Sequence, residues 1–222
     1  MSVTEVRPYR PADRAAIEDI AYRTGFMGES AEAFWRHRES FTSIWIAPYL
    51  DREPDSTFVA TLNGNVMGYL TGCIDTAQFE GPDAVMIKEI TRHGLLFRAG
   101  VAKFLGRAMV DRVLDKWRGH PRVSGELHDS RWPSHLHVNL LPEARRAGLG
   151  RALMETWLAR SRDVGSPGCH LGVIAENQRA VAFFSALGFV PHGDPAPIPG
   201  LRGRRGERLH QQMMVRTTNA WT

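Results

Sequence analysis

The stretch LLPEARRAGLGRALMETWL, residues 140–158, decides the fold class of this chain. Its second half has the apolar spacing of an amphipathic helix, and two arginines and two closely spaced glycines come directly before it. Glycines ahead of a helix leave free backbone N–H groups at the positive end of the helix dipole, where phosphate oxygens bind. The stretch therefore predicts a phosphate-binding loop, with added charge from Arg145, Arg146 and Arg151. A plain helix start with a glycine turn is the simpler alternative.

Two other phosphate-binding loops do not fit. A P-loop requires Gly-x-x-x-x-Gly-Lys-Ser/Thr, and no lysine follows these glycines. A dinucleotide-binding fingerprint requires a third glycine where Leu153 stands. It also requires an acidic residue roughly 20 positions further on, where the sequence reads Ser166 to Gly172.

The flanking sequence predicts strands and helices in alternation. Upstream we expect a short strand and a helix within residues 4–25. Residues 29–51 continue the helical pattern, with Pro48 as the expected stop. A β-hairpin follows, with strands 58–62 and 66–74 around Asn63-Gly64. A helix within residues 95–119 and a loop over 120–134 come next. Downstream we expect strands at 135–142 and 168–177, a helix at 177–189, an irregular tail and a last strand at 211–216. This order indicates an α/β sandwich on a mixed sheet.

Two motifs resemble the GNAT superfamily of N-acetyltransferases. Arg145, Gly148 and Gly150 have the spacing of that family's (Gln/Arg)-x-x-Gly-x-(Gly/Ala) pyrophosphate loop, and residues 177–189 are similar to its Asn-x-x-Ala-x-x-Phe-Tyr-x-x-x-Gly-Phe motif. The resemblance covers most of the chain and implies an α/β fold with a mixed, mostly antiparallel central sheet flanked by helices on both faces. More closely, residues 53–76 and 135–153 resemble the acetyltransferase-like C-terminal domain of O-GlcNAcase and its bacterial relatives.

This resemblance implies acetyl-CoA as the co-substrate and places it by motif position. Its pyrophosphate would lie on the loop and helix start, made of Arg145, Arg146, Ala147, Gly148, Leu149, Gly150 and Arg151. Its pantetheine arm would pair with the backbone of the strand end, Leu140 and Leu141, and would contact Asn177, Ala180, Phe183 and Phe184. Phe183 and Phe184 have a second interpretation as ordinary helix core, which we expect for at least one of them.

The implied reaction is direct attack of a primary amine on the thioester, which requires a base. Phe184 replaces the tyrosine that acts as acid in many members, so the usual acid is missing. The strand that often carries a glutamate base reads SHLHVN, and its period of two places His135, His137 and Asn139 on one face. We predict His137 as base and the Val138 N–H as oxyanion donor. Asn139 and Asp75 are further candidates, and structural roles for all these side chains remain open.

Metal binding is not expected. The His-x-His pair has neither a cysteine nor a carboxylate at ligand spacing, and Cys73 and Cys169 do not form a CxxC pair. Both cysteines should be buried and reduced, which argues against a disulfide-stabilised secreted protein.

Composition narrows the remaining classes. We expect one domain over residues 1–222, because 222 residues with 43% apolar content can fill one sizeable core. No apolar run approaches a membrane span, so a cytoplasmic protein without a membrane partner is predicted. The acceptor would be a small-molecule or peptide amine. Alternatives are a non-catalytic acetyl-CoA-binding module, and a nucleic-acid binder using the arginines at 202–208, which lack interleaved aromatic residues. The sequence does not determine an oligomeric state.

Overall fold

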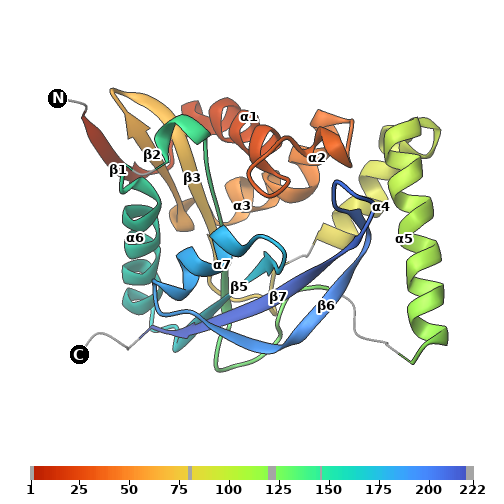
Figure 1. The fold of residues 1–222 in the computed structure, drawn as a ribbon. Coiled ribbons are helices and arrows are strands. Elements are labelled where there is room, and N and C mark those ends of the chain that lie inside the picture. The colour runs from red at the N-terminus through yellow and green to blue at the C-terminus, as the bar shows by residue number, and fades with distance from the viewer. Residues whose placement is uncertain (1–2, 80–81, 120–123, 146, 219–222) are drawn as a thin grey trace.

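The computed structural model describes residues 3–79, 82–119, 124–145 and 147–218. Its centre is a seven-stranded sheet in the order β1-β2-β3-β4-β5-β7-β6 (Figure 1). The strands are β1 (Thr4–Pro8), β2 (Thr57–Leu62), β3 (Asn65–Cys73), β4 (Ser134–Leu140), β5 (Gly168–Ile174), β6 (Val190–Arg202) and β7 (Arg208–Thr217). β4 and β5 pair in parallel, and every other neighbouring pair is antiparallel. The predicted mixed, mostly antiparallel sheet is confirmed.

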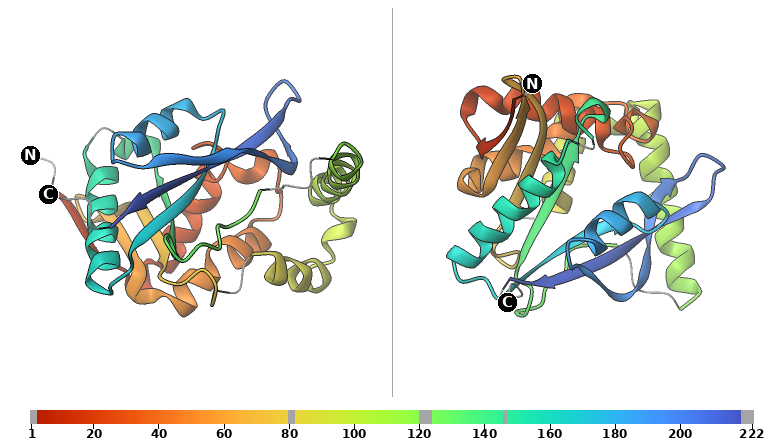
Figure 2. Two further views of the ribbon diagram at one scale, coloured as in Figure 1. Left: turned by 90° about the horizontal axis from the view of Figure 1, so that it is seen from below. Right: turned by 60° about the vertical axis from the view of Figure 1, so that its left-hand side comes forward.

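Helices cover both faces of the sheet, as predicted (Figure 2). One face carries α1 (Arg14–Thr24), α2 (Arg38–Trp45) and α3 (Ala47–Arg52), and the other carries α6 (Leu149–Asp163) and α7 (Gln178–Ser185). Two further helices, α4 (Pro82–Arg92) and α5 (Ala99–Trp117), stand at one side of the molecule.

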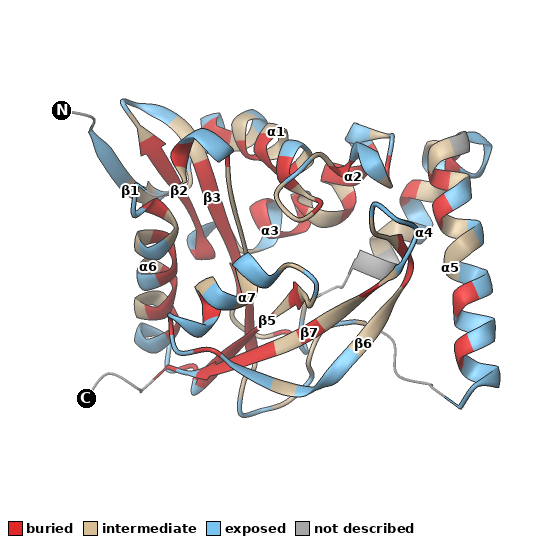
Figure 3. Cartoon of the chain, in the orientation of Figure 1, coloured by how far each residue is buried: buried red, intermediate tan, exposed pale blue. Residues whose placement is uncertain are grey.

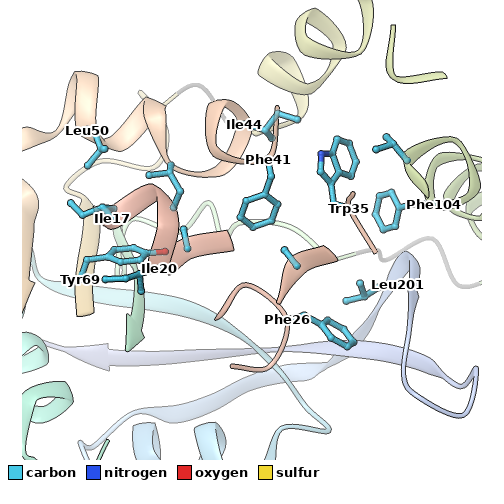
Figure 4. Close-up of a cluster of buried hydrophobic side chains, with 14 of the residues drawn as sticks. Ile17, Ile20, Phe26, Trp35, Phe41, Ile44, Leu50, Tyr69, Phe104 and Leu201 are labelled. Carbon is cyan, nitrogen blue, oxygen red and sulfur yellow. The ribbon is translucent and has the colours of Figure 1, made fainter. Parts of the chain in front are cut away.

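Strand alternation divides the apolar residues between two cores. Val59 and Tyr69 point to the face of α1 to α3, where they join the cluster of Figure 4. Their neighbours Phe58 and Leu70 point to the face of α6. The inner strands are therefore buried on both sides, whereas much of α5 is exposed (Figure 3).

Gly72 on β3 allows α6 to approach the sheet closely. A Cβ atom at this position would lie 2.1 Å from Cζ3 of Trp157, a fully buried α6 residue. Any side chain here would push α6 away from the sheet, so the small residue sets the distance between the two layers.

The predicted hairpin is confirmed. Asn63 and Gly64 have φ angles of 52° and 81°, and they connect β2 to β3. Positive φ at both central residues gives the turn a twist that matches the flanking strands, which is why Asn-Gly is favoured there.

Two helix predictions are wrong in detail. Pro48 does not end a helix but lies in the first turn of α3, where a proline costs no hydrogen bond because that N–H has no helical partner. The single helix expected within residues 95–119 is preceded by another, α4, which ends at Arg92. A 3-10 turn over Leu95–Phe97 then separates α4 from α5.

The tail predicted as irregular instead continues strand β6 to Arg202. Its prolines are tolerated because β6 is an edge strand with β7 as its one partner, so their missing N–H groups need no second neighbour. The pairing is interrupted between His192 and Ala196 and between Pro197 and Arg202, so the strand lacks a regular sequence pattern.

Two of the four arginines at 202–208 anchor α5, whereas Arg204 and Arg205 are exposed. Arg202 makes a two-bond ion pair with Asp111, with distances of 2.7 and 2.6 Å. Arg208 pairs in the same way with Asp115, at 2.8 and 2.6 Å. Both aspartates are buried on α5, so these pairs join the helix to β6 and β7.

None of the helices in the described ranges is long and apolar enough to cross a membrane. Cys73 and Cys169 are buried and unpaired, as predicted. Burial raises the pKa of each thiol to about 12, so both stay protonated and unreactive.

Candidate active site

β4 and β5 separate soon after they begin. Their pairing is limited to Ser134 with Cys169 and His135 with His170, so the edge of β4 beyond this point has no strand beside it. The N–H of Leu141 donates to Met67 O on β3. Because backbone groups alternate along a strand, the N–H groups of Val138 and Leu140 point the other way, into this gap.

The glycine loop lies between β4 and α6. It begins with a 3-10 turn over Pro142–Ala144, and Gly148 occupies the left-handed region with φ 76° directly before α6. The first helical bond runs from Ala152 N to Gly148 O at 3.1 Å, so the N–H groups of the first turn are available to a ligand. N–H groups at a helix start are the kind that bind anions, and phosphate binding at this loop stays a prediction.

The arginines around the loop are not equivalent. Arg145 Nη2 donates to Gly28 O at 3.0 Å, which ties the loop to the segment after α1. Arg151 is exposed and lies 3.7 Å from Glu155 on the same helix. Ala147 is exposed, and Arg146 lies outside the described residues.

The second motif forms the start of α7. Asn177 caps the helix, because its side chain accepts from Ala180 N at 3.3 Å. Phe183 is half-buried and lies beside Gly150, where an added Cβ would meet its ring at 3.4 Å. Phe184 is buried in the core with Phe189, so the expectation that one of the two phenylalanines belongs to the core is met by Phe184.

Two histidines of β4 share a face, as predicted, and meet one tyrosine. Tyr49 on α3 places its hydroxyl 2.8 Å from His135 Nε2 and 2.9 Å from His137 Nε2. The other nitrogen of His135, Nδ1, lies 2.7 Å from the hydroxyl of Thr76. Phe79 stacks on the Tyr49 ring, with 4.6 Å between ring centroids, and closes this cluster.

A carboxylate joins the histidines from the segment before β4. Glu126 Oε2 lies 3.2 Å from Nε2 of His170 on β5. Burial works against ionisation of Glu126, but the His170 bond and the nearby histidines outweigh it and lower its pKa to about 2. The site therefore contains one carboxylate anion among imidazoles.

Burial keeps both β4 histidines neutral. It lowers the pKa of His135 to about 3, against the opposing effect of Glu126. Burial also lowers the pKa of His137, and here too Glu126 acts in the opposite direction. Neutral imidazoles beside a fixed anion can accept a proton, because the anion stabilises the imidazolium that forms.

In the folded chain a carboxylate does accompany the histidine pair, contrary to the prediction from spacing. Glu126, His135 and His137 can each offer a ligand atom to a metal, and these atoms lie within 4.8 Å of one another. In the structure, however, Tyr49 binds both Nε2 atoms and Glu126 contacts His170. Both ring nitrogens of His135 have hydrogen-bond partners, so a metal would have to displace one of them, whereas proton transfer uses these contacts as they stand.

The sequence model of the acetyltransferase (GNAT) family matches residues 14–189. The chain belongs to this family. Among solved structures, SsHAT is 28% identical and superposes with a TM-score of 0.66, covering 97% of this chain and 98% of that one.

More distant GNAT structures show the fold alone. The Salmonella typhimurium protein yncA, solved with its cofactor acetyl-CoA, is 17% identical with a TM-score of 0.58, over 99% of this chain and 96% of that one. The ribosomal-protein-S18-alanine N-acetyltransferase of Escherichia coli is 16% identical with a TM-score of 0.56, over 99% and 97%.

One curated relative matches in part. The mycothiol acetyltransferase of Nocardiopsis dassonvillei is 38% identical over 73 residues, which are 29% of this chain and 22% of that protein. The chain thus spans about a fifth of that relative's length. Together with the family match, this supports an acyltransferase.

Two other candidates in this GNAT chain do not take part in the histidine cluster. The Asp75 carboxylate accepts from Ala77 N at 3.0 Å and from Gln78 Nε2 at 2.6 Å, which caps the turn after β3. Asn139 lies opposite Tyr69 on β3 and is half-buried. In the described parts of the chain, neither side chain bonds to His137.

Four members of the cluster are not predicted from the sequence: Tyr49, Thr76, Glu126 and His170. Tyr49 lies in a stretch with a helical pattern, and Glu126 lies in a segment expected to be loop. One signal is present, because GELHD places two carboxylates and a histidine shortly before the SHLHVN strand. Nothing in the linear pattern shows that Glu126 turns back toward this strand.

Proposed function

We propose that this GNAT protein transfers the acetyl group of acetyl-CoA to a primary amine by direct attack on the thioester. One observation carries the proposal: neutral His137, with the Glu126 anion close by, lies on β4 next to Val138, whose N–H faces the gap between β4 and β5. A base and an oxyanion donor thus come from adjacent positions of one strand.

Acetyl-CoA would bind along the gap and the glycine loop. Leu140 offers its backbone to the pantetheine arm as a neighbouring strand would, and Asn177 at the N-cap of α7 would contact the same arm together with Ala180 and Phe183 of that helix. The first-turn N–H groups of α6 would receive the pyrophosphate. Arg145 supports the loop through Gly28, and Arg151 is exposed and able to reach a phosphate.

The reaction follows from these positions. The amine nitrogen attacks the acetyl carbonyl carbon and a C–N bond forms. The oxyanion that results accepts a hydrogen bond from the Val138 N–H. His137 takes the proton that the nitrogen loses, because the nitrogen becomes acidic as it bonds to carbon. The C–S bond then breaks and yields the amide and the CoA thiolate. Phe184 has no proton to give, so water protonates the thiolate, whose thiol has a reference pKa of about 8.5.

Two segments that are far apart in the chain meet at a hollow that would receive the acceptor. Phe26, Met27 and Glu29 line this hollow together with Gly203, Arg204 and Arg205. Within this proposal the acceptor is a small-molecule or peptide amine, and the protein acts in the cytoplasm as one domain. The finer resemblance to the acetyltransferase-like domain of O-GlcNAcase is also part of it, and rests on residues 53–76 and 135–153.

A non-catalytic acetyl-CoA-binding module is the second candidate, because Phe184 is in the core and supplies no acid. The test combines calorimetric titration of acetyl-CoA with thiol release across a panel of primary amines and peptides. Binding with amine-dependent thiol release supports the transferase. Binding without release from any amine supports the module, and absence of binding contradicts both.

A further inference from the structure

The hydrogen bonds around His135 determine which of its nitrogens carries the proton. Thr76 Oγ1 lies 2.7 Å from Pro133 O and 2.7 Å from His135 Nδ1. A carbonyl oxygen can only accept, so the one hydroxyl proton of Thr76 must lie between Thr76 and Pro133. The Thr76 oxygen then accepts from His135, which places a proton on Nδ1.

The bond between His135 and Tyr49 has a defined direction as well. Because neutral His135 carries its proton on Nδ1, its Nε2 is a bare acceptor that receives the hydroxyl proton of Tyr49 at 2.8 Å. Burial raises the pKa of Tyr49 well above its ordinary value, so the phenol keeps that proton. The Tyr49 oxygen can now act toward the second histidine as an acceptor.

His137 must therefore donate to Tyr49 from Nε2, across 2.9 Å. A neutral imidazole with its proton on Nε2 has a bare Nδ1. Within the described residues, His137 Nδ1 makes no hydrogen bond. The direction of four successive bonds, starting at the carbonyl of Pro133, leaves one nitrogen lone pair of His137 available.

We propose that Tyr49 is a positioning residue, which holds His137 in the tautomer whose Nδ1 accepts the proton of the attacking amine. This role rests on the proposed acetyl transfer. Tyr49 touches no reacting atom. It fixes ring orientation and tautomer, as the orienting partner of a catalytic histidine does.

The surroundings favour orientation over a longer proton relay. Four titratable groups face His137: Glu126 before β4, His170 on β5, His135 on its own strand and Tyr49 on α3. On β3, Cys73 lies opposite His135. Passing the proton through Tyr49 would charge His135, which burial disfavours. On His137 the proton lies near the Glu126 carboxylate, so it stays there until water removes it.

The first test reads the tautomers directly and needs no turnover. In wild-type protein labelled with ¹⁵N-histidine, long-range ¹H–¹⁵N spectra at pH 7.5 should show His135 protonated at Nδ1 and His137 protonated at Nε2. In Tyr49→Phe the His137 signals should shift toward a mixture of tautomers. Tyr69→Phe is the matched control, because among the described residues this buried tyrosine makes no hydrogen bond to either histidine, and its spectra should show the wild-type tautomers.

The second test is kinetic and uses any amine that the wild type accepts. Tyr49→Phe should lower kcat by about tenfold or more, with KM for acetyl-CoA within about twofold, because tautomer and orientation are lost but the cofactor site is not. Thr76→Val removes the hydroxyl that accepts from His135, so it should mix the tautomers of both histidines. Thr76→Ser keeps the hydroxyl and should retain the wild-type spectra.

The outcomes separate this proposal from the proposed function. A wild-type spectrum with His137 protonated at Nδ1 overturns the positioning role, and so does an unchanged His137 tautomer in folded Tyr49→Phe and Thr76→Val. The predicted tautomers in a protein that acetylates no amine would support the bond directions and reject the transferase. Unchanged kcat in Tyr49→Phe with shifted tautomers would reject the role of Tyr49 in turnover.

Discussion

The hydroxyl of Tyr49 lies 2.9 Å from Nε2 of His137, although 88 residues separate the two in the chain. The contact joins α3 to β4 across the face of the sheet. It gives His137 a hydrogen-bonded partner at one ring nitrogen, while Glu126 supplies a nearby negative charge. These contacts make His137 the side chain to test as the base.

We expect His137→Ala to lower kcat/KM by about 10²- to 10⁴-fold, the usual contribution of a general base. Burial lowers the pKa of His137, so the wild-type rate should rise with pH below about 6.5, as the imidazole loses its proton, and level off above. The variant should lack this limb and keep its acetyl-CoA affinity. Asp75→Asn is the control, because the Asp75 carboxylate is bound in its own turn. A flattened pH profile in Asp75→Asn would contradict His137 as the base.

Replacement of Gly148 should weaken acetyl-CoA binding. At φ 76° an alanine is strained by about 1 kcal/mol, and relief of that strain would turn the N–H groups at the start of α6. We expect about a tenfold loss of affinity by calorimetry. Gly165→Ala has the same φ of 76° after the opposite end of α6, so it should lose similar stability and keep full affinity. Equal affinity in both variants would rule out the glycine loop as the phosphate site.

Phe184→Tyr should not restore an acid. The ring is buried in an apolar cluster, so the added hydroxyl would lose its hydration without gaining a partner. We expect a loss of about 1–3 kcal/mol in the free energy of unfolding, measured with denaturant, and no rise in turnover. Faster turnover at unchanged stability would show that the hydroxyl reaches the thiolate after all.

Asp111→Asn should loosen α5. It removes the charge that binds Arg202 through two bonds, and we expect about 2 kcal/mol lower stability in denaturant unfolding. The Arg202 bond lowers the pKa of Asp111, so this contribution is present above about pH 4 and is lost as pH falls through the folded pKa. Asp129→Asn removes an exposed pair and should change little; a similar loss there would argue against a special role for the α5 anchor.

Stability should also fall in mild acid because of His135. Its pKa is about 3 in the folded chain and about 6.5 when unfolded, so the unfolded state binds the proton more readily between these values. At pH 5 this costs the folded state about 2 kcal/mol relative to neutral pH. His135→Gln should remove this part of the pH dependence. His128→Gln, an exposed control, should retain it, and the same slope in His135→Gln would assign the effect to another group.

The sequence by itself determined the local elements of the fold. Asn63-Gly64 specified its hairpin, the period of two placed His135 and His137 on one face of β4, and Gly148 marked the start of α6. These features follow from backbone geometry over a few residues, which near neighbours in the chain settle. The glycine loop is therefore recognisable from its residues alone.

Only the tertiary structure decided which groups surround His137. Tyr49 and Glu126 come from a short helix and from a loop, and neither has a periodic pattern that points to β4. The ion pairs of Arg202 and Arg208 with α5, and the strand role of the prolines in β6, are likewise invisible in the linear sequence. The physical reason is the same in each case: burial and hydrogen bonding across elements depend on how the layers pack, which no local spacing encodes.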